Sequence, residues 1–246
     1  LLVLDNGNCF KAVVSYAFEA GANEDEMAEE FLLIFKREKL LQHKFYKTHI
    51  FWSFAESILV PNELMDAERN VNMVTLVFGE AKNGVIRSDH LFKPNLHNVY
   101  RIPQSTIDVF SANLPMATQT HFFSTLVNRN IPEGNNLFAI IYRNYLTIML
   151  CKQGKLQAVQ NFEYSSPDDC AFHLLNVCKG FDVPPDMINL QISGMIDINS
   201  GLFSAIYKYF LKIEFQELPN GYTYQKDIQE HPGHFFSHLF SLAQCV

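Results

Sequence analysis

Near the start of the chain, an apolar run is followed by an acidic residue and a glycine. The stretch LLVLDNGNCF places Asp5 and Gly7 directly after four apolar residues. A strand that ends in Asp-x-Gly can form a phosphate loop, because the Asp organises a metal ion and the Gly lets backbone N–H groups approach the phosphates. This stretch therefore raises the hypothesis of nucleotide chemistry, and the alternative is a simple hairpin turn.

The second half of the chain has the clearer secondary-structure pattern. Three apolar segments predict strands that pair antiparallel, at residues 137–142, 145–151 and 156–164. Tight turns at Arg143-Asn144 and around Gly154 connect them. A helix over 168–180, a strand at MINLQISG, a helix over 201–212, a strand at IEFQEL and a terminal helix opened by Pro232 follow.

The first half gives a looser version of the same order. CFKAVVSYAF predicts a strand, and NEDEMAEEFLLIFKREKLL predicts a helix with acidic residues in its first turn and basic residues in its last. KTHIFWSFAESILVP predicts one strand that stops at Pro61, NVNMVTLVFGE and its neighbours predict further strand, and THFFSTLVNRN predicts a closing helix.

These orders predict an α/β fold of two tandem ribonuclease H-like units, each β-β-β-α-β-α-β-α, which is the architecture of actin-like ATPases. A short stretch rich in Pro, Gly and Asn divides them, so residues 1–133 form the first unit and residues 134–246 the second.

Counting along the two units places the opening stretch. Gly154 precedes Asp168 by 14 residues and Gly7 precedes Asn23 by 16, and a helix begins at each of these later positions. The turn at Asn6-Gly7 thus matches the second hairpin of its unit, and we expect an Asn-Gly hairpin turn there because both residues tolerate positive φ. The first strand of this unit, with its own turn, would then precede Leu1.

The chain resembles family 3822 of the domains of unknown function, a set of uncharacterised bacterial proteins. The resemblance is carried by CKQGKLQAVQNFEY with the helix after it, by INLQISGMIDINSGLFSAIYKYF and by SILVPNEL, and it covers most of the chain. It implies an actin-like ATPase fold, and no activity, substrate or partner.

Two places are candidate contacts for a nucleotide in the cleft between the units. Arg143 and Asn144 occupy the position of the second phosphate loop, but the turn Tyr142-Arg143-Asn144-Tyr145 contains no carboxylate and no glycine. An exposed hairpin Arg is the simpler interpretation. Ser193 and Gly194 follow a strand where this fold carries a Gly-rich turn on the adenosine side, and the alternative is a glycine that only ends the strand.

Other chemistry has little support. His234 and His238 are spaced as metal ligands on a helix can be, close to His231, but no Glu lies between them, so an exposed histidine face on a terminal helix is favoured over a metal site. The sequence has no P-loop, no G-x-G-x-x-G and no G-x-S-x-G motif.

Composition limits partners and compartment. A net charge of -7, without a basic block, disfavours nucleic acid. Five cysteines, an odd number without a C-x-x-C pair, indicate reduced thiols and a cytoplasmic location. No apolar run approaches the ~20 residues that span a bilayer, and the opening stretch lacks the basic segment of a signal peptide.

These observations favour a non-catalytic scaffold or protein-interaction module with a degenerate actin-like ATPase fold, a protein partner and no cofactor. The alternative is a divergent kinase or ATPase that binds ATP and Mg²⁺ in the cleft, with Asp5, Gly7, Ser193 and Gly194 as its contacts.

Overall fold

The computed structural model describes residues 1–18, 23–129 and 131–245. Contacts divide the chain into two units, one made of Leu1–Ser15 with Arg129–Val246 and the other of Tyr16–Asn128. The prediction divides the chain at 133/134 and places residues 1–15 in the first unit, whereas the contacts group Leu1–Ser15 with the second half. We call the two groups the outer-segment unit (Leu1–Ser15 with Arg129–Val246) and the middle-segment unit (Tyr16–Asn128).

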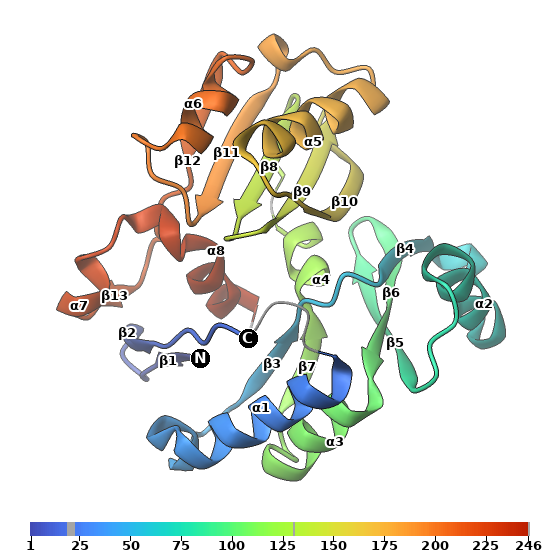
Figure 1. The fold of residues 1–246 in the computed structure, drawn as a ribbon, viewed down its shortest axis with the longest axis vertical. Helices are drawn as coiled ribbons and strands as arrows, with labels where there is room; N and C mark the ends of the chain where they lie inside the picture. The colour runs from blue at the N-terminus through green and yellow to red at the C-terminus, as the bar shows by residue number, and fades with distance from the viewer. Residues whose placement is uncertain (19–22, 130, 246) are drawn as a thin grey trace. The chain divides into compact units, whose positions relative to one another are not determined.

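A five-stranded sheet forms the centre of the outer-segment unit (Figure 1). Three strands pair antiparallel in sequence order, the fourth runs parallel to the first, and the fifth runs parallel to the fourth. The order across the sheet is β10-β9-β8-β11-β12, with bounds β8 Asn136–Ile141, β9 Tyr145–Lys152, β10 Lys155–Glu163, β11 Asn189–Gly194 and β12 Lys212–Phe215. This is the predicted ribonuclease H-like arrangement.

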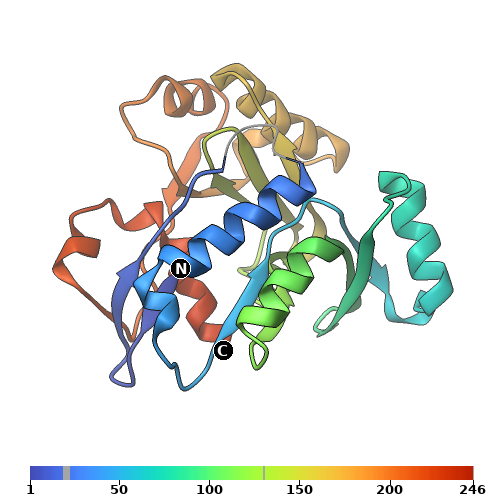
Figure 2. The ribbon, with the colours of Figure 1, turned by 60° about the horizontal axis from the view of Figure 1, so that its bottom comes forward.

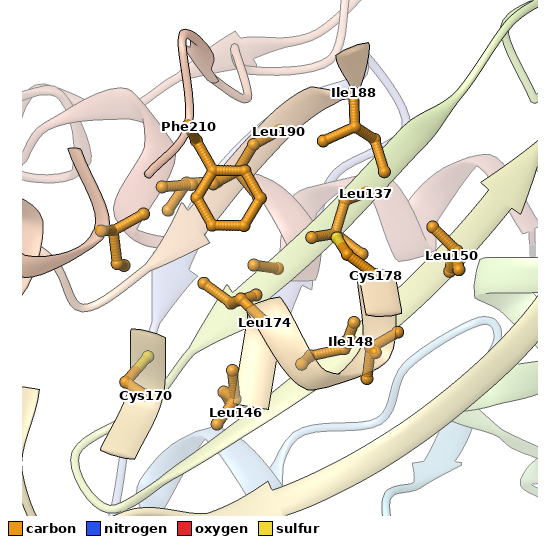
Figure 3. Packing of buried hydrophobic residues seen from close by; sticks show 14 of the residues in the cluster. Leu137, Leu146, Ile148, Leu150, Cys170, Leu174, Cys178, Ile188, Leu190 and Phe210 are labelled. Atoms are coloured by element: carbon orange, nitrogen blue, oxygen red, sulfur yellow. The ribbon is translucent and has the colours of Figure 1, made fainter. Parts of the chain in front are cut away.

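Helix α5 (Pro167–Gly180) packs on this sheet and has both ends fixed by local chemistry. Ser166 and Asp169 form a capping box, in which each side chain accepts from the backbone N–H of the other residue. Figure 3 shows how the helix side chains meet those of the strands. The buried cluster includes Leu137, Leu146, Ile148, Leu150, Cys170, Leu174, Cys178, Leu190 and Phe210.

The C-terminal part of this unit is more broken than the sequence predicts. Helix α6 (Gly201–Tyr207) stops five residues before the predicted end at 212, where β12 begins. The predicted terminal helix is a series of short pieces, and Phe236, at φ -123° and ψ 7°, departs from helical geometry between the first two. The pieces are the 3₁₀ helix η4 Gly233–Phe235, α8 Ser237–Phe240 and the 3₁₀ helix η5 Ser241–Cys245, and a further short helix, α7 Lys226–Gln229, precedes them.

The first residues of the chain join the outer-segment unit through a small second sheet. β1 (Leu2–Leu4) pairs antiparallel with β2 (Cys9–Val13), and β2 pairs in parallel with β13 (Thr223–Tyr224). Phe10, fully buried, packs with Ile228 and Phe240. This apolar contact is the physical reason why residues 1–15 group with the second half.

The middle-segment unit contains two sheets. β3 (His49–Trp52) and β7 (Thr118–His121) form a parallel pair, as expected for the fourth and fifth strands of the first ribonuclease H-like unit. A separate antiparallel sheet has the order β4-β6-β5, with bounds β4 Ser57–Pro61, β5 Gly84–Phe92 and β6 Asn95–Pro103. That a first strand precedes Leu1 stays a prediction.

Among its described residues, this unit contains four α-helices. Both views show α1 and α3 side by side (Figures 1 and 2), and α2 packs on the antiparallel sheet through Val74. Their bounds, with those of two 3₁₀ helices, are α1 Glu24–Arg37, α2 Ala67–Phe78, α3 Gln104–Asn113, α4 Phe122–Val127, η1 Lys39–Gln42 and η2 Asn62–Leu64. The helix α1 has the predicted acidic first turn and basic last turn.

Two predictions for this region are wrong. The segment NVNMVTLVFGE is mostly helix α2 and not strand, because the Asp66 side chain accepts from the N–H groups of Glu68 and Arg69 at 3.1 and 3.0 Å and Gly79, at φ +83°, ends the helix. The predicted strand from Lys47 to Pro61 is interrupted between β3 and β4.

Candidate functional site

The hairpin between β8 and β9 is the segment that the sequence predicts at the position of the second phosphate loop. Arg143 and Asn144 form its exposed tip. The Tyr142 N–H donates to the Tyr145 carbonyl at 2.9 Å, and the two tyrosine rings stack with centroids 4.3 Å apart at 15°. The turn is therefore closed by paired aromatic rings on either side of two large residues.

Tyr164, at the end of β10, holds this hairpin from the side. Its hydroxyl donates a short hydrogen bond to the Tyr142 carbonyl, and its N–H donates to the Asn144 carbonyl at 3.0 Å. Burial raises the pKa of the Tyr142 and Tyr145 hydroxyls, so both stay neutral at physiological pH. The hairpin thus presents neutral aromatic groups and one exposed guanidinium, without the glycine that close approach of phosphates requires.

Gly194 needs to be glycine because of the neighbouring strand. It has φ +94°, and a Cβ there would lie 2.1 Å from the Ile141 carbonyl oxygen. The next residue, Met195, donates its N–H to that same oxygen at 2.7 Å. The close approach of β11 to β8 accounts for the glycine without any ligand. Ser193 is buried at 2% exposure, which leaves its side chain little access to solvent.

The structure brings the four predicted contacts to one end of one sheet. Gly194 pairs with Ile141 in the parallel ladder, and Tyr142 and Arg143 come directly after Ile141. Both pairs of candidates therefore lie at the carboxyl ends of adjacent parallel strands, where open α/β sheets bind ligands. At this end of the sheet, the hairpin is closed by two stacked tyrosine rings, and the Ile141 carbonyl oxygen occupies the space beside Gly194.

One charged side chain at this end of the sheet was missed by the sequence reasoning. Arg129 is half-buried, and its guanidinium donates to the His238 carbonyl at 3.4 Å. The His238 ring lies edge-on to Tyr142, with centroids 5.4 Å apart. Nothing in the local sequence distinguishes Arg129 from a surface arginine after helix α4, because its neighbours come from segments about 110 residues later.

The Asp5 turn is a hairpin, as predicted, but its geometry differs from the predicted one. The Asp5 carboxylate accepts from the N–H groups of Gly7 and Cys9 at 2.9 and 2.8 Å and forms an ion pair with Lys11 at 3.0 Å. Positive φ occurs at Asn8 (+57°) rather than at Asn6-Gly7. These contacts hold the pKa of Asp5 below its ordinary value, and the hydrogen bond from the Cys9 N–H has the largest effect. The Asp5 carboxylate therefore stabilises the turn through its hydrogen bonds to the backbone.

The three C-terminal histidines do not share a face. His234 lies in η4, where its ring nitrogen is 2.8 Å from the Ile196 carbonyl, and His238 lies in α8, buried at 2% exposure. Burial lowers the pKa of His238 to about 3, so its ring is neutral. Among residues 1–18, 23–129 and 131–245, no group of three or more His, Cys, Asp and Glu side chains could hold a metal ion.

A second polar cluster, also missed, lies in the middle-segment unit. Asp89 accepts from the His121 N–H at 2.7 Å, the Ser124 hydroxyl at 2.6 Å and the Tyr100 hydroxyl at 3.1 Å. Asn98 donates to Ser124 at 3.0 Å. Each of these groups is committed to a partner within the cluster, which is the pattern of a structural network that joins β5 and β6 to the start of α4.

The His121 ring cannot serve as the base of a catalytic triad in this cluster. Its Nδ1 accepts from the Phe123 N–H at 3.1 Å and its Nε2 lies 3.0 Å from the Phe54 carbonyl. The side chain is fully buried, and burial lowers its pKa to about 4. Both ring nitrogens are therefore used by the backbone, and the ring caps helix α4.

Comparison with known proteins agrees with the fold. A Bacteroides thetaiotaomicron VPI-5482 protein with an actin-like ATPase fold and unknown function is 15% identical, with a TM-score of 0.77 over 96% of this chain and 87% of that one. A chain of the PilM-PilN type IV pilus biogenesis complex is 14% identical, with a TM-score of 0.64 over 99% of this chain and 93% of that one. At these identities the similarity shows the fold, which is that of the actin-like ATPases.

The family described as "Protein of unknown function (DUF3822)" matches residues 1–213. No curated protein matches the chain. In the described part of the chain, every helix is too short or too polar to span a bilayer.

Proposed function

We propose that this chain, which belongs to the DUF3822 family of proteins of unknown function, is a non-catalytic module that binds another protein. It has the actin-like ATPase fold, and we infer that this fold here serves as a scaffold. The proposal includes no cofactor.

The β8-β9 hairpin is the observation that carries this proposal. A phosphate loop needs a carboxylate for the metal and small residues that let the backbone approach the phosphates. Here the turn is Arg143-Asn144 between stacked tyrosine rings, fixed from the side by Tyr164. The position at which the fold would bind phosphate is occupied by side-chain packing.

Two further observations support an interaction role. The Asp5 carboxylate, the other candidate for metal coordination, accepts two backbone N–H groups and pairs with Lys11. One of the similar structures was solved as a complex, PilM with PilN. A member of this fold thus associates with a partner protein, and we propose the same general role for this chain.

We also propose a cytoplasmic location, because Cys151, Cys170 and Cys178 are buried free thiols. Burial raises their pKa to about 11, 12 and 11, so they are unreactive at neutral pH.

A thermal-shift measurement with ATP and Mg²⁺ tests the absence of a nucleotide site. A ligand that binds only the folded state raises its stability, and a site with a Kd of ~0.1 mM would raise Tm by about 5 °C at about 5 mM ATP. We expect ATP with Mg²⁺ to give no larger shift than inorganic tripolyphosphate at the same concentration.

The matched control for this test is a hairpin variant. Asn144→Gly would give the turn the small residue that it lacks, and we expect it to leave the response to ATP and Mg²⁺ unchanged. An ATP shift that requires Mg²⁺ and exceeds the tripolyphosphate shift would overturn the proposal. It would favour the alternative, a divergent kinase or ATPase with Asp5, Gly7, Ser193 and Gly194 as nucleotide contacts.

A further inference from the structure

Arg129 carries a positive charge at a place where burial makes that charge costly. Its side chain is half-buried, and its single hydrogen bond to the described residues is the long one to the His238 carbonyl, 3.4 Å. A guanidinium has five N–H donors in a planar fork. Most of this donor capacity is therefore unused by the parts of the chain that the structure describes.

Among residues 1–18, 23–129 and 131–245, no carboxylate forms an ion pair with Arg129. The ion pairs formed among the described residues are Lys11 with Asp5 and Arg101 with Glu56, and Arg129 takes part in neither. The titratable side chains that act on it are those of Cys245 and Tyr142. Burial raises the pKa of both groups, so both are neutral at pH 7. Accordingly, burial lowers the pKa of Arg129.

The surroundings of Arg129 differ from those of Arg101. Arg101 is also mostly buried, and it has a carboxylate partner, Glu56, together with the Gly79 carbonyl at 2.9 Å. Its charge is neutralised within the fold. A charge taken out of water without such a partner is unfavourable. Arg129 is thus a half-buried cation whose charge is not neutralised by any described carboxylate, and an external anion could neutralise it.

We propose that Arg129 is the centre of an oxyanion-binding site at the carboxyl end of β8, next to the Tyr142-Tyr145 hairpin. The ligand group is a phosphate or a carboxylate, because these planar or tetrahedral oxyanions match the fork of a guanidinium with two parallel hydrogen bonds. Tyr142 lies close enough to act electrostatically on Arg129, and its ring stacks on that of Tyr145 with centroids 4.3 Å apart. This proposal does not rest on the scaffold role, since it requires neither adenosine nor Mg²⁺.

The test uses the full chain with inorganic probes. Sodium phosphate, sodium pyrophosphate and sodium acetate are compared with sodium chloride at constant ionic strength. For a site with a Kd near ~1 mM, we expect a Tm increase of about 3–6 °C at about 20 mM of the preferred anion. Phosphate and pyrophosphate shifts above the acetate shift identify a phosphate site, and the reverse order identifies a carboxylate site.

Two arginine variants provide the matched comparison. Arg87→Gln removes an exposed charge from the middle-segment unit, outside the proposed site, and it should keep the full shift. Arg129→Gln should abolish the shift, and Arg129→Lys, which keeps the charge but not the fork, should retain less than half of it. An unchanged shift in Arg129→Gln would overturn the proposal, as would the absence of a shift in the wild type.

A second measurement on the wild type needs no variant. In NMR spectra of protein labelled at tyrosine, the preferred anion should move the ring resonances of Tyr142 and Tyr145 with one saturating Kd. Tyr100, in the middle-segment unit, is the internal reference and should not move. Saturable shifts that involve Tyr100 and leave Tyr142 in place would put the anion elsewhere and contradict the assignment.

Discussion

Replacement of Gly194 by Ala tests whether the glycine at the end of β11 is required by packing. An Ala at φ +94° costs about 1–2 kcal/mol, because L-residues avoid this region. Its Cβ would lie 2.1 Å from the Ile141 carbonyl oxygen, so β11 must move away and the Met195 N–H bond to that oxygen is lost. That loss adds about 1 kcal/mol, and the displacement of packed strands adds more.

The expected destabilisation of Gly194→Ala is therefore at least ~3 kcal/mol. Gly134 supplies the control, because it lies in the same unit at φ +87° and a Cβ there meets nothing within 4 Å. Gly134→Ala should show only the backbone cost of about 1–2 kcal/mol. The difference between the two variants isolates the steric contact with Ile141.

Urea unfolding followed by far-UV circular dichroism measures both variants, and hydrogen exchange at β8 and β11 locates the effect. Faster exchange should be confined to these strands in Gly194→Ala. If Gly194→Ala were no more destabilising than Gly134→Ala, the close approach of β11 to β8 would not be what requires glycine, and a ligand-binding role for this turn would regain support.

Two further predictions concern the polar network of the middle-segment unit, in which Trp52, the single tryptophan, reports unfolding by its fluorescence. Burial lowers the pKa of His121 from 6.5 to about 4, so between these pH values the unfolded chain takes up a proton that the folded chain excludes. The free energy of unfolding is therefore highest above pH 6.5 and falls by about 3 kcal/mol as the pH approaches 4. His121→Gln should flatten this decline, and an equally steep decline in the variant would contradict the assignment to His121. Asp89→Ala removes the acceptor of three hydrogen bonds and should cost about 3 kcal/mol or more, whereas Asp89→Asn, which keeps one acceptor oxygen, should cost less; equal losses in the two variants would show that the acceptor oxygens are not what matters.

The five-stranded sheet is predictable from sequence because each signal there is local. β8 and β9 are near-continuous apolar runs, and Gln153 and Gly154 adopt the positive φ values, +52° and +70°, that a short hairpin needs. Ser166 and Gly180 mark the two ends of α5. Local propensity, turn residues and apolar period all agree in this region.

Helix α2 shows why the first half was harder to predict. Its sequence contains three valines and a threonine between Ala67 and Phe78, and β-branched residues favour strands. The capping contacts of Asp66 and the packing of Val74 on the sheet override that preference. The i, i+4 spacing of Val74 and Phe78, which both pack on the sheet, was the available signal.

The candidate site was predictable only in part. The sequence showed that the hairpin at Arg143-Asn144 lacks a phosphate-loop composition. It did not show that the Ile141 carbonyl requires Gly194 to be glycine, or that Arg129 lies next to His238, because both contacts join residues far apart in the chain. Such contacts depend on how strands and helices pack, which no local pattern encodes.

Isothermal titration of the full chain with ATP and Mg²⁺ tests the central claim, that the closed aromatic hairpin leaves no nucleotide site. The account predicts no saturable binding of ATP with Mg²⁺ beyond that of inorganic tripolyphosphate, in the wild type and in Arg129→Gln alike. The account would be contradicted if ATP bound with a micromolar Kd that requires Mg²⁺, while tripolyphosphate did not bind.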